Sequence, residues 1–113
     1  MDVIVKTGKN FTANFVLATK VVVDPDFVTV YVQDKGLKAR MPYERGVLVV
    51  HVIPYTGGFL AIRADDVMTA ETDWVTGVDS HSDGRLTIEY SRDSRLRIEA
   101  YSLITIEERP KNP

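Results

Sequence analysis

The stretch GVLVVHVIPYTGGFLAIRADDVMTAE, residues 46–71, indicates the fold more strongly than any other part of the chain. Its first strand-like segment, Val47–Ile53, is aliphatic at both odd and even positions apart from one histidine, His51. A strand that is apolar on both faces is typical of the centre of a fold. We therefore expect residues 47–53 to form the central strand, covered on both sides by a second sheet or by another subunit.

A similar pattern recurs 36 residues further along the chain. When Leu60–Glu71 is aligned with Leu96–Glu107, leucine, isoleucine, alanine, threonine and glutamate coincide. Each segment follows a predicted hairpin, with turns at Pro54–Gly58 and at Ser91–Ser94. Two copies are too few for a solenoid, so the pattern indicates at most two pseudo-repeated hairpin units. Chance resemblance between β-rich segments remains the alternative.

Alternating apolar and polar residues elsewhere predict further strands. The alternation from Phe11 to Val23 is longer than an ordinary strand, so we expect one long strand with a bend or a bulge. Proline and aspartate in Asp24-Pro25-Asp26 should end it. Shorter strands are expected at residues 3–7, 27–33 and 37–41, with a turn at 34–36 and a loop at 42–46.

Residues 64–74 are ambiguous between a strand and a short helix. Asp65 could cap a helix that places Val67, Ala70 and Trp74 on one side. The aligned segment Leu103–Ile106 is rich in β-branched residues, which favours a strand after a polar corner. We expect the strand, and we expect the polar stretch Thr76–Gly84 to be the longest surface loop.

The predicted fold is all-β: a small, mostly antiparallel barrel or sandwich of about eight strands. The chain has 113 residues, which is the size of one domain. We expect a single domain over residues 1–108, followed by a frayed tail over residues 109–113.

The composition limits the location of the protein and its partners. The absence of cysteine excludes disulfides and favours a reducing compartment, so we expect a cytoplasmic protein. No apolar run approaches the roughly 20 residues that span a bilayer, so we expect no membrane partner. The formal net charge of −2 makes nucleic acid an unlikely partner without excluding it.

The motifs that we associate with catalysis, cofactors or phosphate binding are absent, so we expect no enzyme and no cofactor. His51 lies between valines, where a half-buried structural histidine is the simpler interpretation. Asp79, His81 and Asp83 alternate, but their spacing matches no established zinc pattern, so we expect no metal.

The remaining function is binding. We expect a protein-interaction module of adaptor or inhibitor type that self-associates, because aromatic residues around the central strand exceed what one small core can hide. One alternative is a small anionic, nucleotide-like ligand held by arginines. A second alternative is single-stranded nucleic acid. The candidate contact residues are Tyr55, Phe59, Trp74, Arg63, Arg95, Arg97 and His81.

Overall fold

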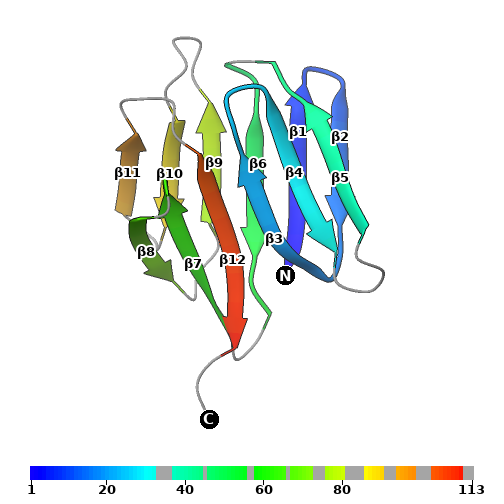
Figure 1. The fold of residues 1–113 in the computed structure, drawn as a ribbon. Helices are drawn as coiled ribbons and strands as arrows, with labels where there is room; N and C mark the ends of the chain where they lie inside the picture. Colours follow the sequence, from blue (N-terminus) through cyan, green and yellow to red (C-terminus); the bar gives the residue numbers. More distant parts are fainter. Residues whose placement is uncertain are drawn as a thin grey trace.

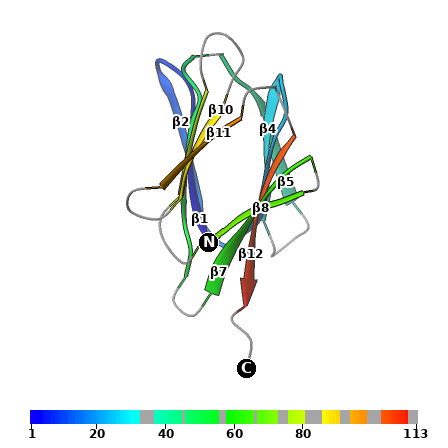
Figure 2. The same cartoon turned by 90° about the vertical axis from the view of Figure 1, so that its left-hand side faces the viewer.

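A computed structural model shows a two-layer β-sandwich (Figures 1 and 2). It describes residues 1–32, 37–44, 46–55, 58–65, 67–72, 76–80, 86–90, 94–98 and 103–110. Twelve strands lie within this part of the chain, and every described pairing is antiparallel. They are β1 (Asp2–Gly8), β2 (Phe11–Phe15), β3 (Ala18–Val23), β4 (Phe27–Val32), β5 (Leu37–Pro42), β6 (Val49–Ile53), β7 (Gly58–Ala64), β8 (Val67–Thr72), β9 (Thr76–Ser80), β10 (Leu86–Tyr90), β11 (Ser94–Ile98) and β12 (Ile104–Pro110).

The strands form two sheets of six. Sheet A has the order β11-β10-β9-β6-β1-β2, and sheet B has the order β5-β4-β3-β12-β7-β8. The all-β, mostly antiparallel prediction is confirmed, and the sandwich rather than the closed barrel is its form. Twelve strands are described rather than the expected eight or so, and two of the additional strands arise because one predicted strand is divided and a predicted loop contains another.

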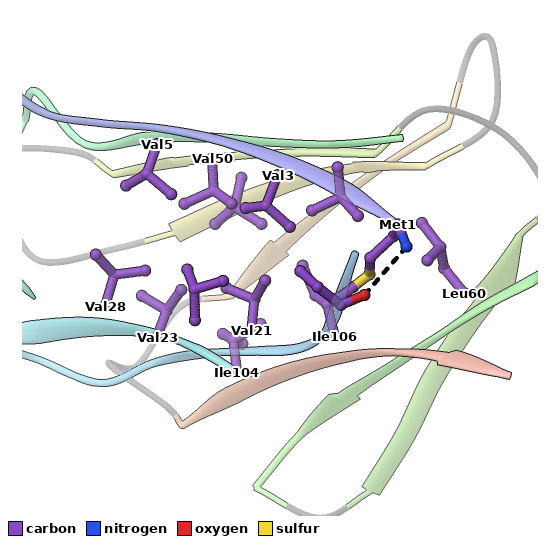
Figure 3. Packing of buried hydrophobic residues seen from close by; sticks show 14 of the residues in the cluster. Met1, Val3, Val5, Val21, Val23, Val28, Val50, Leu60, Ile104 and Ile106 are labelled. Carbon is purple, nitrogen blue, oxygen red and sulfur yellow. Dashed lines mark hydrogen bonds between the residues drawn. The ribbon is translucent and has the colours of Figure 1, made fainter. Parts of the chain in front are cut away.

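The core lies between the two sheets and is built from alternate strand positions. Valine and isoleucine residues of β1, β3, β6 and β12 point inward and are fully buried (Figure 3). Burying one such side chain contributes roughly 1.5–3 kcal/mol, so the alternation of apolar residues provides most of the driving force for this fold. The central members are Val3, Val5, Val21, Val23, Val50, Val52, Ile104 and Ile106.

The predicted long strand over residues 11–23 is divided between the two sheets, which corrects the expectation of one strand. β2 pairs with β1 in sheet A, whereas β3 pairs with β4 and β12 in sheet B. The chain bends at Val16 and Leu17, where Leu17 has a φ of 57°. This left-handed conformation is uncommon for leucine, and no residue type at this bend indicates it in the sequence.

Strand β6 is central in sheet A, but the described part of the chain covers only one of its faces. Val50 and Val52 are fully buried, whereas Val49, His51 and Ile53 are exposed on the opposite face. The expectation of a second covering sheet is therefore wrong for the described residues, cover by another subunit stays a prediction, and His51 is exposed rather than half-buried. The reason is that sheet B covers one side of sheet A only.

The two pseudo-repeated hairpin units are not a structural repeat. β7 and β8 pair as a hairpin within sheet B, whereas β11 belongs to sheet A and β12 to sheet B. The turn at residues 54–58 likewise joins the two sheets, because β6 is in sheet A and β7 is in sheet B. β10 and β11 do form a hairpin, as predicted. The two segments therefore have a similar alternation of apolar and polar residues, but their strands are placed differently in the two sheets.

Four local expectations have clear outcomes. The turn after β3 is confirmed: the Asp24 carboxylate accepts hydrogen bonds from the backbone N–H of Asp26 (2.8 Å) and of Phe27 (2.7 Å). The preference for a strand after Asp65 is confirmed by β8. The predicted loop over residues 76–84 is wrong for Thr76–Ser80, which form β9 between β6 and β10. β12 also continues to Pro110, past the expected boundary at residue 108.

Candidate functional site

The outer face of sheet A, which points away from sheet B, exposes three aliphatic side chains. Ile4 of β1 and Val49 of β6 are each 38% exposed, and Ile53 of β6 is 36% exposed. Ile4 is the Cα partner of His51, which lies between Val49 and Ile53 on the same face of β6. We call Ile4, Val49, His51 and Ile53 the outer patch. Sheet-face positions of this kind are usually polar when they face water, so the patch is a candidate contact surface.

Opposite charges lie on the same strand on either side of the outer patch. Asp2 and Lys6 flank Ile4 at alternate positions of β1, with Ile53 and Val49 as their Cα partners. A surface with an apolar centre and both signs of charge at its border is suited to contact with protein rather than with a polyanion.

A second group of polar contacts lies where β1 begins, and Tyr55 is its centre. The Tyr55 hydroxyl donates a hydrogen bond to Oδ1 of Asp2 (2.6 Å) and accepts one from the backbone N–H of Leu17 (3.0 Å). The bond to Asp2 raises the pKa of Tyr55 above its ordinary value of 10.0, against a smaller lowering by the bond from Leu17. Tyr55 therefore holds the bend between β2 and β3.

Glu108 of β12 links this group to both sheets. Its carboxylate accepts hydrogen bonds from the backbone N–H of Tyr55 (2.8 Å) and from the amino group of Met1 (2.8 Å). Met1 also bonds to Ala18 in both directions, through its amino group (3.0 Å) and its carbonyl oxygen (2.9 Å). These bonds join β1, the bend and β12, so their main role is to fix this end of the sandwich.

The part of sheet B formed by β3, β4 and β5 has a different outer face, because basic and aromatic residues alternate on it, with Glu107 of β12 opposite Lys20 at its border. Tyr31 of β4 has Lys20 and Lys38 as its Cα partners on the two neighbouring strands. The Lys20 Nζ atom lies 5.4 Å from the centre of the Tyr31 ring, and the Arg40 guanidinium lies 3.9 Å from that of Phe27. β3, β4 and β5 contain these three basic residues and no aspartate or glutamate. We call this surface the basic face.

The candidate contact residues from the sequence are distributed over several regions. Tyr55 is 39% exposed, and Phe59, the second residue of β7, is half-buried. Arg63 lies in sheet B, where its Nη1 atom is 3.7 Å from Oε1 of Glu107. Arg95 and Arg97 belong to β11 of sheet A, so the three arginines do not lie in one sheet. Trp74 and His81 lie outside the described residues.

Several exposed apolar residues were not among these candidates. Ile4 could have been found, because Val3, Ile4 and Val5 form a short run that is apolar on both faces. Phe11, Val16 and Leu17 are 52%, 64% and 49% exposed. The alternation of residues 11–23 assigns Phe11 and Leu17 to the core. The bend at Leu17 places Leu17 in water, whereas Phe11 stays on the inner side of β2 but lies at the far end of this edge strand, opposite Gly8.

Comparison of this chain with family models, curated proteins and solved structures found no match. Within the described ranges, no group of three or more histidine, cysteine, aspartate or glutamate residues could hold a metal ion. No helix in that part of the chain is long and apolar enough to cross a membrane.

Proposed function

We propose that this protein is a non-enzymatic binding module that acts by contact with protein surfaces and that self-associates. The outer patch is the observation that supports contact with a partner protein, because Ile4, Val49 and Ile53 leave apolar area in water. The edge position of β2, the last strand of sheet A, is the observation that supports self-association. Burial of such area on association is favourable in proportion to the area removed from water. The cysteine-free sequence supports a cytoplasmic location.

Native mass spectrometry of the gently purified protein tests this function. We expect masses at multiples of the 12.7 kDa chain, with a fraction of assembled protein that rises with concentration. A bare monomer over a wide concentration range would contradict self-association. Additional mass beyond whole chains would instead reveal a retained ligand and favour the anionic-ligand alternative, for which Arg63, Arg95 and Arg97 remain the candidate residues.

The basic face supports a second function, the binding of single-stranded nucleic acid. Its lysines and Arg40 could contact phosphates, and the Phe27 and Tyr31 rings could stack on bases once the cations above them move aside. The test is the affinity for a fluorescent oligothymidylate at several salt concentrations. Lys20→Ala with Lys38→Ala should reduce the salt dependence, because fewer counterions are released. Lys6→Ala, on the other sheet, is the matched control. No salt-dependent binding by the wild type would exclude this function.

A further inference from the structure

Strand β2 is an unprotected sheet edge. It is the last strand of sheet A, and no strand in the described part of this chain lies beyond it. An edge strand directs about half of its backbone N–H and C=O groups away from its neighbour, ready to pair with another strand. Natural proteins block such edges with lysine, proline or bulges. The sequence of β2, Phe-Thr-Ala-Asn-Phe, contains neither a charge nor a proline, and the irregularity in its pairing with β1 lies between Lys6 and Gly8 of β1 rather than in β2 itself.

We propose that the β2 strands of two copies of this protein pair antiparallel about a two-fold axis at Ala13, which joins their A sheets into one. The proposal rests on the self-association in the proposed function and assigns its interface. A two-fold interface brings the same surface of both copies together, so residue i meets j and j meets i. In β2 this pairing sets Phe11 opposite Phe15 of the second copy, and Thr12 opposite Asn14.

The side chains of β2 are complementary to themselves in this register. Thr12 and Asn14 are both exposed on the outer side, where a threonine and an asparagine can hydrogen-bond across strands. On the inner side, Phe15 packs against the core and Phe11 is 52% exposed. Pairing would therefore place the exposed ring of each copy beside the anchored ring of the other, a favourable aromatic contact that occurs twice. The near-palindromic sequence makes a second copy the fitting occupant of this edge.

The outer patch fits this role less well. Its three aliphatic residues are each only a little more than one third exposed and are interrupted by His51. It offers no backbone hydrogen bonds, whereas β2 offers them along its length. In the joined sheet, β2 lies beside β1, so the two outer patches would lie on one continuous face. Edge pairing would thus leave both patches open to a different partner.

Charge placement on β2 provides the test. In Thr12→Lys with Asn14→Lys, each copy would set a lysine opposite a lysine of the other copy. In Thr12→Lys with Asn14→Glu, each new lysine would lie opposite a new glutamate. Both positions are exposed, so neither pair of changes disturbs the core of one chain. Sedimentation velocity of both variants and the wild type gives the dissociation constant of the dimer, and hydrogen exchange reports the protection of β2 amides.

We expect the lysine–lysine variant to dissociate about 30-fold more easily, because two like-charged cross-strand pairs replace two polar ones. The lysine–glutamate variant should remain a dimer, and its β2 amides should exchange more slowly as concentration rises. Equal dimerisation of both variants and the wild type would overturn the β2 interface while leaving self-association intact. A monomeric wild type would overturn both the interface and the proposed self-association.

Discussion

β2 and β5 are the last strands of the two sheets on the same side of the sandwich, and they differ in charge (Figure 1). β5 carries Lys38, Arg40 and Pro42, the residue types that discourage edge pairing. Arg40 and Lys38 are exposed, and the Arg40 guanidinium stacks on the Phe27 ring of the neighbouring strand. β2 has none of these features.

The comparison shows that β5 is protected against pairing with another strand, whereas β2 is not. Both strands pair with one neighbour only, so their backbone groups face the same problem in water. β5 carries charged side chains that repel a second strand. β2 presents side chains that are complementary to those of a second β2, which is expected of an edge that pairs with another copy.

The largest effect is expected from the two phenylalanines of β2. Phe15→Ala should lower the free energy of unfolding by about 2 kcal/mol, because a ring packed against the core is lost from a partly buried site. Phe11→Ala should change the stability of the monomer by less than about 1 kcal/mol, since about half of its side chain is already in water. Urea denaturation at low protein concentration measures both values.

The same two variants also report on association. Each removes one ring from a proposed Phe11–Phe15 contact, so both should weaken the dimer although only one destabilises the chain. If both variants lose the same monomer stability, Phe11 is part of the core. The proposed contrast between an exposed Phe11 and a core-packed Phe15 would then be wrong.

A smaller effect on stability, with a change in assembly, is expected from removal of the β5 charges. Lys38→Thr with Arg40→Thr makes the β5 edge resemble β2, and it removes the cation–π contact with Phe27, which contributes about 0.5–1 kcal/mol. With the neighbouring edges β2 and β5 both uncharged, copies can join through both sheets, so light scattering should detect species larger than a dimer. Lys38→Arg with Arg40→Lys keeps both charges and is the control.

If the threonine variant has the same mass as the wild type, the charges are not what protects β5. Pro42, which cannot donate a backbone hydrogen bond, would then be the protecting residue.

The third effect concerns the end of β2 and depends on pH. The hydrogen bond to Asp2 raises the pKa of Tyr55, so the folded protein holds the hydroxyl proton more tightly than the unfolded chain does. This contribution to stability is complete below about pH 10 and is lost as the pH rises through the raised pKa. Loss of the proton removes the hydrogen bond to Asp2 and places a phenolate beside its carboxylate, so it should weaken the link between Tyr55 and the start of β1.

Urea midpoints measured from about pH 8 to about pH 11 test this point. The wild type should lose more stability above pH 10 than Tyr55→Phe, which lacks the titrating group and should be less stable at neutral pH. Tyr31→Phe controls for the loss of a tyrosine elsewhere. Parallel pH profiles for wild type and Tyr55→Phe would exclude the proposed role of the hydroxyl.

Much of the fold could be predicted from alternation alone. Val3 and Val5, or Val21 and Val23, share a face because strand side chains alternate, and that face became the core. The bend at Leu17 could not be predicted, because leucine rarely adopts a positive φ and nothing in its neighbours marks a turn. That one conformation sends residues 18–23 into the other sheet.

The candidate contact surface was harder to predict than the fold. The apolar outer side of β6 is visible in the sequence, but the sequence cannot show whether Val49 and Ile53 are covered by a sheet or left open. Arg63, Arg95 and Arg97 are similar in sequence context, yet sheet membership separates the first from the other two. The sheet to which a residue belongs depends on the order of the strands, and the alternation of residues within one strand does not encode that order.

The smallest effect is expected on the outer patch, and it decides which surface joins the copies. Val49→Thr with Ile53→Thr keeps β-branched residues on the strand but makes the patch more polar, so the unfolding free energy should change by less than about 1 kcal/mol. Val50→Thr with Val52→Thr, on the buried side of the same strand, is the contrasting control and should be strongly destabilising, because each hydroxyl enters an apolar core. If β2 joins the copies, the dissociation constant of the Val49→Thr, Ile53→Thr variant should equal that of the wild type. A variant that folds normally but no longer dimerises would instead place the interface on the outer patch, and the open edge of β2 would then need another explanation than pairing between copies.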